Sequence, residues 1–208
     1  MQVHALDRAR HALAAAETRA GVRPTAERVE LGGLSDLFPE GLASGRVVSM
    51  QGATSAVFAA AAGAMGAEGW LAMVGMRNVG WAAAAGAGID LRRVVVVDSA
   101  TADAVALCVD AFDVVVLGGV ELAAGERRSL EGRMRSRRTT VISRGAWPGA
   151  AQIRADVDHS EGCGRGDGYV RSWEVVADRL DRPARVVLTC AGRIEAAKEQ
   201  RAHLRVVV

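Results

Sequence analysis

The segment with the clearest chemical layout is residues 49–60, which read SMQGATSAVFAA. A glycine between a short apolar strand and a helical run is typical of a phosphate-binding loop, G-x-x-x-x-G-K-[ST]. In that loop backbone N–H groups wrap the phosphates, lysine neutralises them and the hydroxyl holds magnesium. Gly52 stands at the first glycine, but Val57, Phe58 and Ala59 occupy the last three positions. The sequence thus has the layout of a nucleotide site without the residues that hold a nucleotide.

Other segments with catalytic or ligand-binding residue types give little more. The strand-like VVVVDS ends in Asp98, which we interpret as a strand end, with Ser99 or Thr101 capping the next helix. No G-x-G-x-x-G opens a helix after a strand, so a dinucleotide site has little support. The three cysteines are far apart and form no C-x-x-C, which argues against a disulfide frame or a zinc site. We therefore expect no cofactor and no metal.

Composition bounds the class of protein. The chain has 208 residues, of which 50% are apolar and only 4% aromatic, so we expect a core of Ala, Val and Leu. The net charge of +2 does not by itself indicate nucleic acid. The first 20 residues carry charge throughout and no long apolar run follows, so we expect a cytoplasmic protein with no membrane segment.

Periodicity predicts the elements that would position these residues. Apolar strands alternate with helical segments from residue 47, which indicates an α/β fold with a mostly parallel central sheet flanked by helices. After residue 143 the period becomes two, which predicts an antiparallel extension of the same sheet. The predicted strands are VVSM, WLAMVG, VVVVD, VVVLGG, TTVIS, AQIRADVDHS, YVRSWEVVADR and ARVVLTCAG, and the predicted helices lie near 54–66, 78–86, 101–110 and 121–136. The segment EGCGRGDG (161–168) is predicted to be a turn.

The sequence divides into four parts. Residues 1–22 predict an amphipathic helix, 23–33 a linker, 34–192 the α/β domain and 193–208 a tail. The apolar face of the N-terminal helix could pack on its own core or on another protein. The tail could fray, or its end could add a strand to a partner's sheet. The candidate interaction residues in these two segments are Val3, Leu6, Leu13, Leu204, Arg205, Val206, Val207 and Val208.

The order of elements and the lead-in LFPEGLASGRVVSMQGATS resemble the RecA recombinase core over about residues 34–192. The resemblance implies a RecA-like fold with an ATP site. In that family the strand FDVVVLGGV would end in the metal-binding aspartate, and Gly118 stands there instead. Arg77 stands at the position of the catalytic glutamate. With Val57, Phe58 and Ala59, these departures predict a pseudo-ATPase rather than an enzyme.

The resemblance also raises the question of DNA binding. Recombinases bind single-stranded DNA through a long loop after the fifth strand, but only RGAWPGA joins TTVIS to AQIRADV here. A basic segment offers another surface, which could contact DNA, contact a protein partner or serve as a solvated helix face. Its residues are Arg127, Arg128, Arg133, Arg135, Arg137 and Arg138.

Within the wider family the chain is most similar to actinobacterial ImuA-type proteins, RecA relatives that lack a functional P-loop. LFPEGLASGRVVSMQGATSAVFAAAAGAM and AQIRADVDHSEGCGRG carry this similarity. It implies an accessory role in damage-induced, error-prone translesion synthesis. The implied partners are an ImuB-type Y-family polymerase paralogue and, through it, a C-family error-prone polymerase and the sliding clamp; a second copy of the chain is a further candidate. A SulA-like division inhibitor and a Rossmann-type enzyme that uses a nucleotide or S-adenosylmethionine stay as alternatives.

Overall fold

The structure is a computed structural model that describes residues 28–29, 34, 36–38, 42–164, 167–181, 184–190 and 194–196. The predicted helix of residues 1–22 and the tail from 197 onward lie outside these residues. The candidate interaction residues Val3, Leu6, Leu13 and 204–208 therefore fall outside the described part of the chain.

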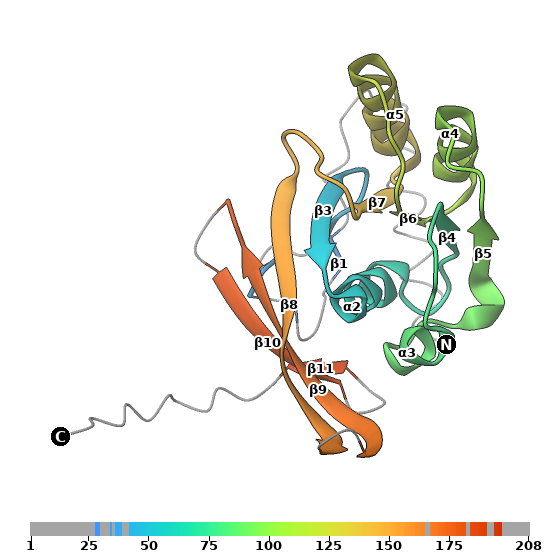
Figure 1. Cartoon of the computed structure of the whole chain (residues 1–208). Helices are drawn as coiled ribbons and strands as arrows, with labels where there is room; N and C mark the ends of the chain where they lie inside the picture. Colours follow the sequence, from blue (N-terminus) through green and yellow to red (C-terminus); the bar gives the residue numbers. More distant parts are fainter. Residues whose placement is uncertain are drawn as a thin grey trace, which may run out of the picture.

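A nine-stranded sheet forms the centre of the fold, in the order β11-β10-β9-β8-β3-β7-β6-β4-β5 (Figure 1). Its parallel part consists of β3 (Val47–Gly52), β4 (Leu71–Val74), β5 (Val94–Val97), β6 (Val114–Leu117) and β7 (Thr140–Ser143). β4, β5 and β6 consist only of Val, Leu, Met and Ala, and β4, β6 and β7 are buried along their whole length because helices cover both faces. The prediction of a mostly parallel α/β sheet is confirmed.

Helices cover both faces of the parallel strands. They are α2 (Thr54–Met65), α3 (Trp81–Gly86), α4 (Ala102–Ala111) and α5 (Ala124–Arg137), with a short 3-10 turn at Leu91–Arg93. Alternate strand residues enter two separate cores, since successive side chains of a strand point to opposite faces. Met73 of β4 packs in the core that contains α2 and α3, whereas its neighbours Ala72 and Val74 pack in the core that contains α4 and α5.

An antiparallel extension completes the sheet, as predicted. β8 (Ala151–Gly164) runs parallel to β3, and β9 (Asp167–Arg179), β10 (Ala184–Cys190) and β11 (Ile194–Ala196) follow in antiparallel pairs. β8 and β9 form a long hairpin beside α2 (Figure 1). The predicted turn at 161–168 is wrong in extent, because both strands continue into it and only 165–166 separate them. Gly162, at φ +103°, lies at an irregularity inside the strand pair.

Two short strands, one before and one after the predicted domain of residues 34–192, pair with strands inside it. β1 (Arg28–Val29) lies in the segment assigned to the linker and pairs with β2 (Leu42–Ala43) in a separate two-stranded sheet. β11 lies in the segment assigned to the tail and pairs with β10.

The connection from β7 to β8 is fixed to the body of the protein. Trp147 is buried, and its indole N–H donates to Glu131 Oε1 of α5 at 2.8 Å. The Gln152 side chain donates to the Trp147 carbonyl at 2.9 Å. Ser49 and Ser143 both donate their hydroxyl to the Gly145 carbonyl, at 2.9 and 3.0 Å. These contacts hold residues 144–150 in one place at the carboxyl end of β7.

Candidate functional site at the carboxyl ends of the strands

The turn after β3 keeps its glycine for a backbone reason. Gly52 has φ +91°, and a Cβ atom there would lie 1.9 Å from the Ala155 carbonyl oxygen of β8. The next residue, Ala53, donates its N–H to the same carbonyl at 2.6 Å. Any other side chain would separate β3 from β8, since real Cβ atoms do not approach an oxygen so closely. Gly52 is therefore explained by the pairing of these two strands, without a phosphate.

The rest of the loop pattern lies inside a helix. Only Ala53 separates the end of β3 from the first residue of α2, Thr54. Val57 and Phe58 are each 1% exposed and belong to the core between α2 and the sheet. Ala59 is partly buried and packs against the same core. A loop that wraps a phosphate needs several residues before its helix begins, and this junction has one.

Arg144, the first residue after β7, crosses to this junction. Its Nη1 donates to Thr54 Oγ1 at 3.0 Å and its Nη2 donates to the Gly52 carbonyl at 2.9 Å. A guanidinium has five N–H donors, so three remain for other acceptors. Arg144 thus ties the end of β7 to the start of α2 and places its positive charge between them. No sequence motif identifies Arg144 as a functional residue; its place directly after a parallel strand is the available signal.

Gly118, at the end of β6, has no room for a side chain. A Cβ atom at this position would lie 2.2 Å from the Gly75 carbonyl oxygen, and the Gly118 N–H donates to the Val74 carbonyl at 2.8 Å. The ends of β4 and β6 therefore approach each other too closely for an aspartate. The absence of the metal-binding aspartate at Gly118 accordingly has a structural cause in the spacing of two backbones.

A cavity of about 450 Å³ lies beside these glycines. It is lined by Arg77, Arg144 and residues of the loops that follow β4, β6 and β7, namely Gly75, Met76, Gly118, Gly119 and Gly145. The chain leaves β4 for α3 on one face of the sheet and leaves β6 for α5 on the other. Such a switch point at the carboxyl ends of parallel strands is where open α/β sheets bind their ligands.

The electrostatics of the cavity are those of an anion site. Arg77 is exposed and Arg144 is partly buried. Among the residues that the structure describes, neither guanidinium forms an ion pair with a carboxylate. The same described residues contain no group of three or more His, Cys, Asp or Glu that could hold a metal ion.

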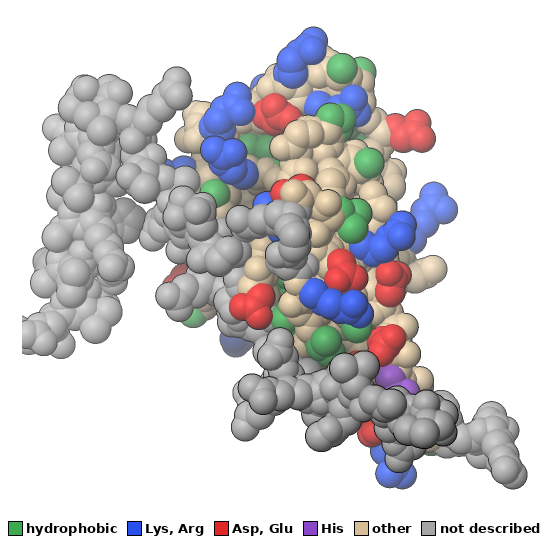
Figure 2. Space-filling model, turned by 90° about the vertical axis from the view of Figure 1, so that its left-hand side faces the viewer, with side chains coloured by type: hydrophobic (Ala, Val, Ile, Leu, Met, Phe, Trp, Pro, Cys, Tyr) green, Lys and Arg blue, Asp and Glu red, His purple; other side chains and the backbone are tan. Residues whose placement is uncertain are grey.

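Three of the six arginines of the basic segment already bind other groups of the protein. Arg133 and Arg137 both pair with Asp110 of α4, at 2.5 and 3.3 Å. Arg127 donates to the Leu122 carbonyl at 2.6 Å. Arg128 and Arg135 are exposed on α5. In Figure 2, basic side chains gather near the top, the end where α4 and α5 lie in Figure 1, with acidic ones among them.

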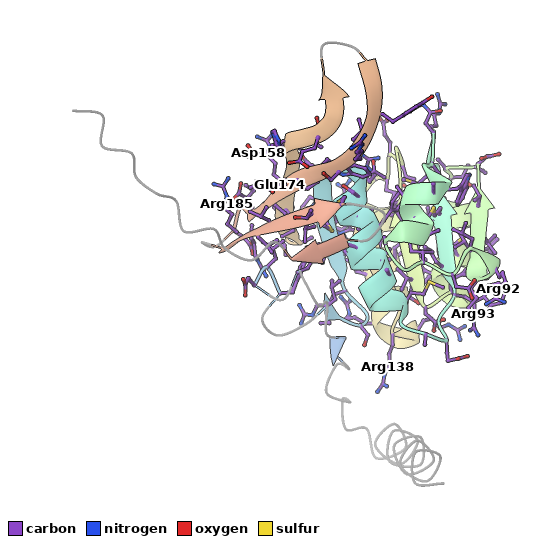
Figure 3. All side chains as sticks on the ribbon, turned by 90° about the horizontal axis from the view of Figure 1, so that it is seen from below. Arg92, Arg93, Arg138, Asp158, Glu174 and Arg185 are labelled. Carbon is purple, nitrogen blue, oxygen red and sulfur yellow. The ribbon has the colours of Figure 1, made fainter. Side chains whose placement is uncertain are left out.

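The arginines labelled in Figure 3 lie at separate places on the protein. Arg138, which ends α5 in a left-handed conformation at φ +61°, points away from the body of the protein in Figure 3. Arg92 and Arg93 lie at the β5 edge of the sheet, whereas Arg185 lies on the antiparallel extension (Figure 3). The labelled arginines therefore do not form one continuous basic surface.

Two other sequence predictions are explained by local structure. Thr101 caps α4, because its Oγ1 accepts the Ala104 N–H at 3.3 Å, which confirms Thr101 as one of the two expected caps.

Cys108 and Cys190 are both buried free thiols, and burial raises the pKa of each above its ordinary value. For Cys190 a hydrogen bond with Ser55 opposes part of that rise in pKa. Neither thiol has the lowered pKa of a reactive cysteine.

No described helix is long and apolar enough to cross a membrane.

Comparisons with known proteins place the chain in a family. No curated protein matches the chain. Residues 36–149, which include the cavity and all five strands of the parallel part, match the family described as the MT3502 N-terminal domain. Because this match covers more than half of the sequence, the chain belongs to the MT3502 N-terminal domain family.

Proposed function

We propose that this protein is a non-catalytic, RecA-like scaffold of damage-induced, error-prone translesion DNA synthesis. Its proposed partner is an ImuB-type Y-family polymerase paralogue, through which it is joined to a C-family polymerase and the sliding clamp. In this proposal the protein acts by binding other proteins, and no nucleotide is turned over.

The observation that carries the non-catalytic part is the junction between β3 and α2. One residue, Ala53, separates the strand from the helix, and Phe58 is buried where a P-loop lysine would meet the phosphates. Phosphate charges placed against this apolar side chain lose the lysine that would neutralise them, which costs several kcal/mol. The Arg144 guanidinium near the junction is already bonded to Thr54 and to the Gly52 carbonyl. The lack of space at Gly118 and the position of Arg77 support the same conclusion, because both exclude the carboxylates that a magnesium-dependent ATPase needs.

The order of the elements supports the RecA-like part. Within the nine-stranded sheet, the parallel strands come first in the sequence and the antiparallel strands last. This is the arrangement that the resemblance to the recombinase core implies. The partner assignment depends on the similarity to ImuA-type proteins in the lead-in and in the β8 region.

Co-expression with an ImuB-type paralogue, followed by size-exclusion chromatography with light scattering, tests the proposal. We expect a stable complex of fixed stoichiometry that forms equally well with and without Mg–ATP, because no nucleotide switches the scaffold. A parallel co-expression with a tubulin-like division protein is the control. Binding to the division protein in place of the polymerase paralogue would refute the role in mutagenesis and favour a division inhibitor. A complex that requires ATP would refute the non-catalytic scaffold.

A further inference from the structure

The cavity between Arg77 and Arg144 has the features of a binding site that no comparison assigns. It lies at a switch point of the sheet, and in the described part of the chain its two guanidiniums have no carboxylate partner. Arg144 is held in place by Thr54 and Gly52, so little of its conformational freedom remains to be lost on binding. A fixed, uncompensated guanidinium beside an exposed one attracts an anionic group.

The backbone of the cavity limits which anion fits. Three N–H groups at its edge are already used inside the sheet: Gly75 donates to Val97, Gly118 to Val74 and Arg144 to Leu117. A polyphosphate site relies on a series of free backbone N–H groups, and here most of the donors are guanidinium nitrogens. The lining residues also include no aromatic side chain on which a base could stack. A carboxylate is planar, carries a single charge and pairs directly with the guanidinium fork. It therefore needs few further N–H donors from the cavity.

The surface beside the cavity is suited to a protein rather than to a free small acid. β8 pairs with β3 as far as Ala155, opposite Gly52, and then continues past the carboxyl end of the parallel strands. Only β3 separates β8 from β7, the strand that Arg144 directly follows. The projecting hairpin exposes three large apolar side chains, Val157 at 56%, Tyr169 at 89% and Val170 at 50%. An apolar surface next to an anion site can bind a polypeptide that carries both kinds of group.

We propose that the Arg77–Arg144 cavity receives an aspartate or glutamate side chain of a partner protein, whose neighbouring apolar residues pack on the β8–β9 hairpin. This inference rests on the proposed scaffold function and names the surface and the chemistry through which the scaffold recognises its partner.

A titration of the full-length protein tests the cavity without any partner. The probes are acetyl-Gly-Glu-Gly-amide, its Gln analogue and inorganic phosphate, and the readout is the backbone amide NMR signals of Gly119 and Gly145. We expect weak, saturable shifts with the Glu peptide, little response to the Gln peptide and weaker binding of phosphate. Arg77→Glu, at an exposed position, should weaken the Glu peptide at least about tenfold, the factor that follows when one charge-assisted contact is lost. Arg46→Glu, at the exposed amino end of β3, is the matched control and should change nothing.

Equal shifts with Glu and Gln peptides, phosphate that binds as tightly as the Glu peptide, or an Arg77→Glu variant that binds normally would each overturn the inference. The co-expression assay separates it from the proposed function. If the wild-type complex forms and Arg77→Glu abolishes it, both are supported; if Arg77→Glu forms the same complex, the inference fails and the scaffold stands. If no wild-type complex forms, the scaffold proposal fails, and the peptide titration alone decides whether the cavity binds a carboxylate.

Discussion

Replacing Phe58 with lysine puts back the residue whose absence most clearly separates this chain from an ATPase. Phe58 is 1% exposed and lies between α2 and the sheet, so its position belongs to the core. Truncating a buried Phe costs about 3–5 kcal/mol. Lysine also brings a charge that must be buried without a partner, which adds to the loss. We expect Phe58→Lys to lower the free energy of unfolding by at least ~3 kcal/mol out of a total of about 5–15 kcal/mol.

The assay is urea denaturation, together with thermal unfolding with and without Mg–ATP. For a chain of this size a loss of about 3–5 kcal/mol corresponds to a melting temperature about 6–20 °C lower. Phe58→Leu is the matched control, because it keeps an apolar side chain and should cost about 1.5 kcal/mol or less. A Phe58→Lys variant with wild-type stability, whose melting temperature rises with Mg–ATP, would refute the reasoning, since it would mean that the site accepts the lysine as a P-loop does.

Three further predictions follow from the structure. Gly118→Ala should destabilise the fold by about 1–3 kcal/mol in urea because of its contact with a neighbouring carbonyl, whereas Gly119→Ala, with open space around it, should have little effect; equal effects would contradict the crowding. Asp110→Asn, which removes the ion pairs to α5, should cost about 1 kcal/mol or less at low salt, and the difference from wild type should shrink in high salt; a loss that persists unchanged in high salt would mean that the effect is not electrostatic. The raised pKa of Cys108 and Cys190 means that stability holds below the ordinary thiol pKa near 9.0 and falls as pH rises above it, by at most about 1.4 kcal/mol per pH unit for each thiol; the double alanine variant should flatten this fall, and an unchanged slope would exclude the thiols as its cause.

The parallel part of the sheet could be predicted because its strands are continuous apolar runs. Val94–Val97 and Val114–Leu117 contain no polar residue, and each is followed by a segment with a helical pattern. That combination fits buried parallel strands joined by helices and little else. The change to period two after residue 143 also correctly predicted the antiparallel strands.

Features that depend on contacts between distant residues could not be predicted. Gly118 could be interpreted as a lost aspartate, but the carbonyl that excludes a side chain there belongs to Gly75, which follows β4 and lies more than 40 residues away in the sequence. Gly162 could be interpreted as a turn, because glycine marks turns and strand irregularities alike. The contact of Arg144 with Gly52 and Thr54 joins residues about 90 positions apart, and no local pattern indicates it.

The junction between β3 and α2 decides whether this protein uses a nucleotide, and it can be observed directly. Backbone amide NMR signals of residues 52–58 should be followed as Mg–ATP is raised to millimolar concentration. We predict that these signals do not shift, because one residue separates strand from helix and a buried phenylalanine stands at the lysine position of the loop pattern. Saturable shifts confined to these amides would place ATP at the junction and contradict the non-catalytic scaffold.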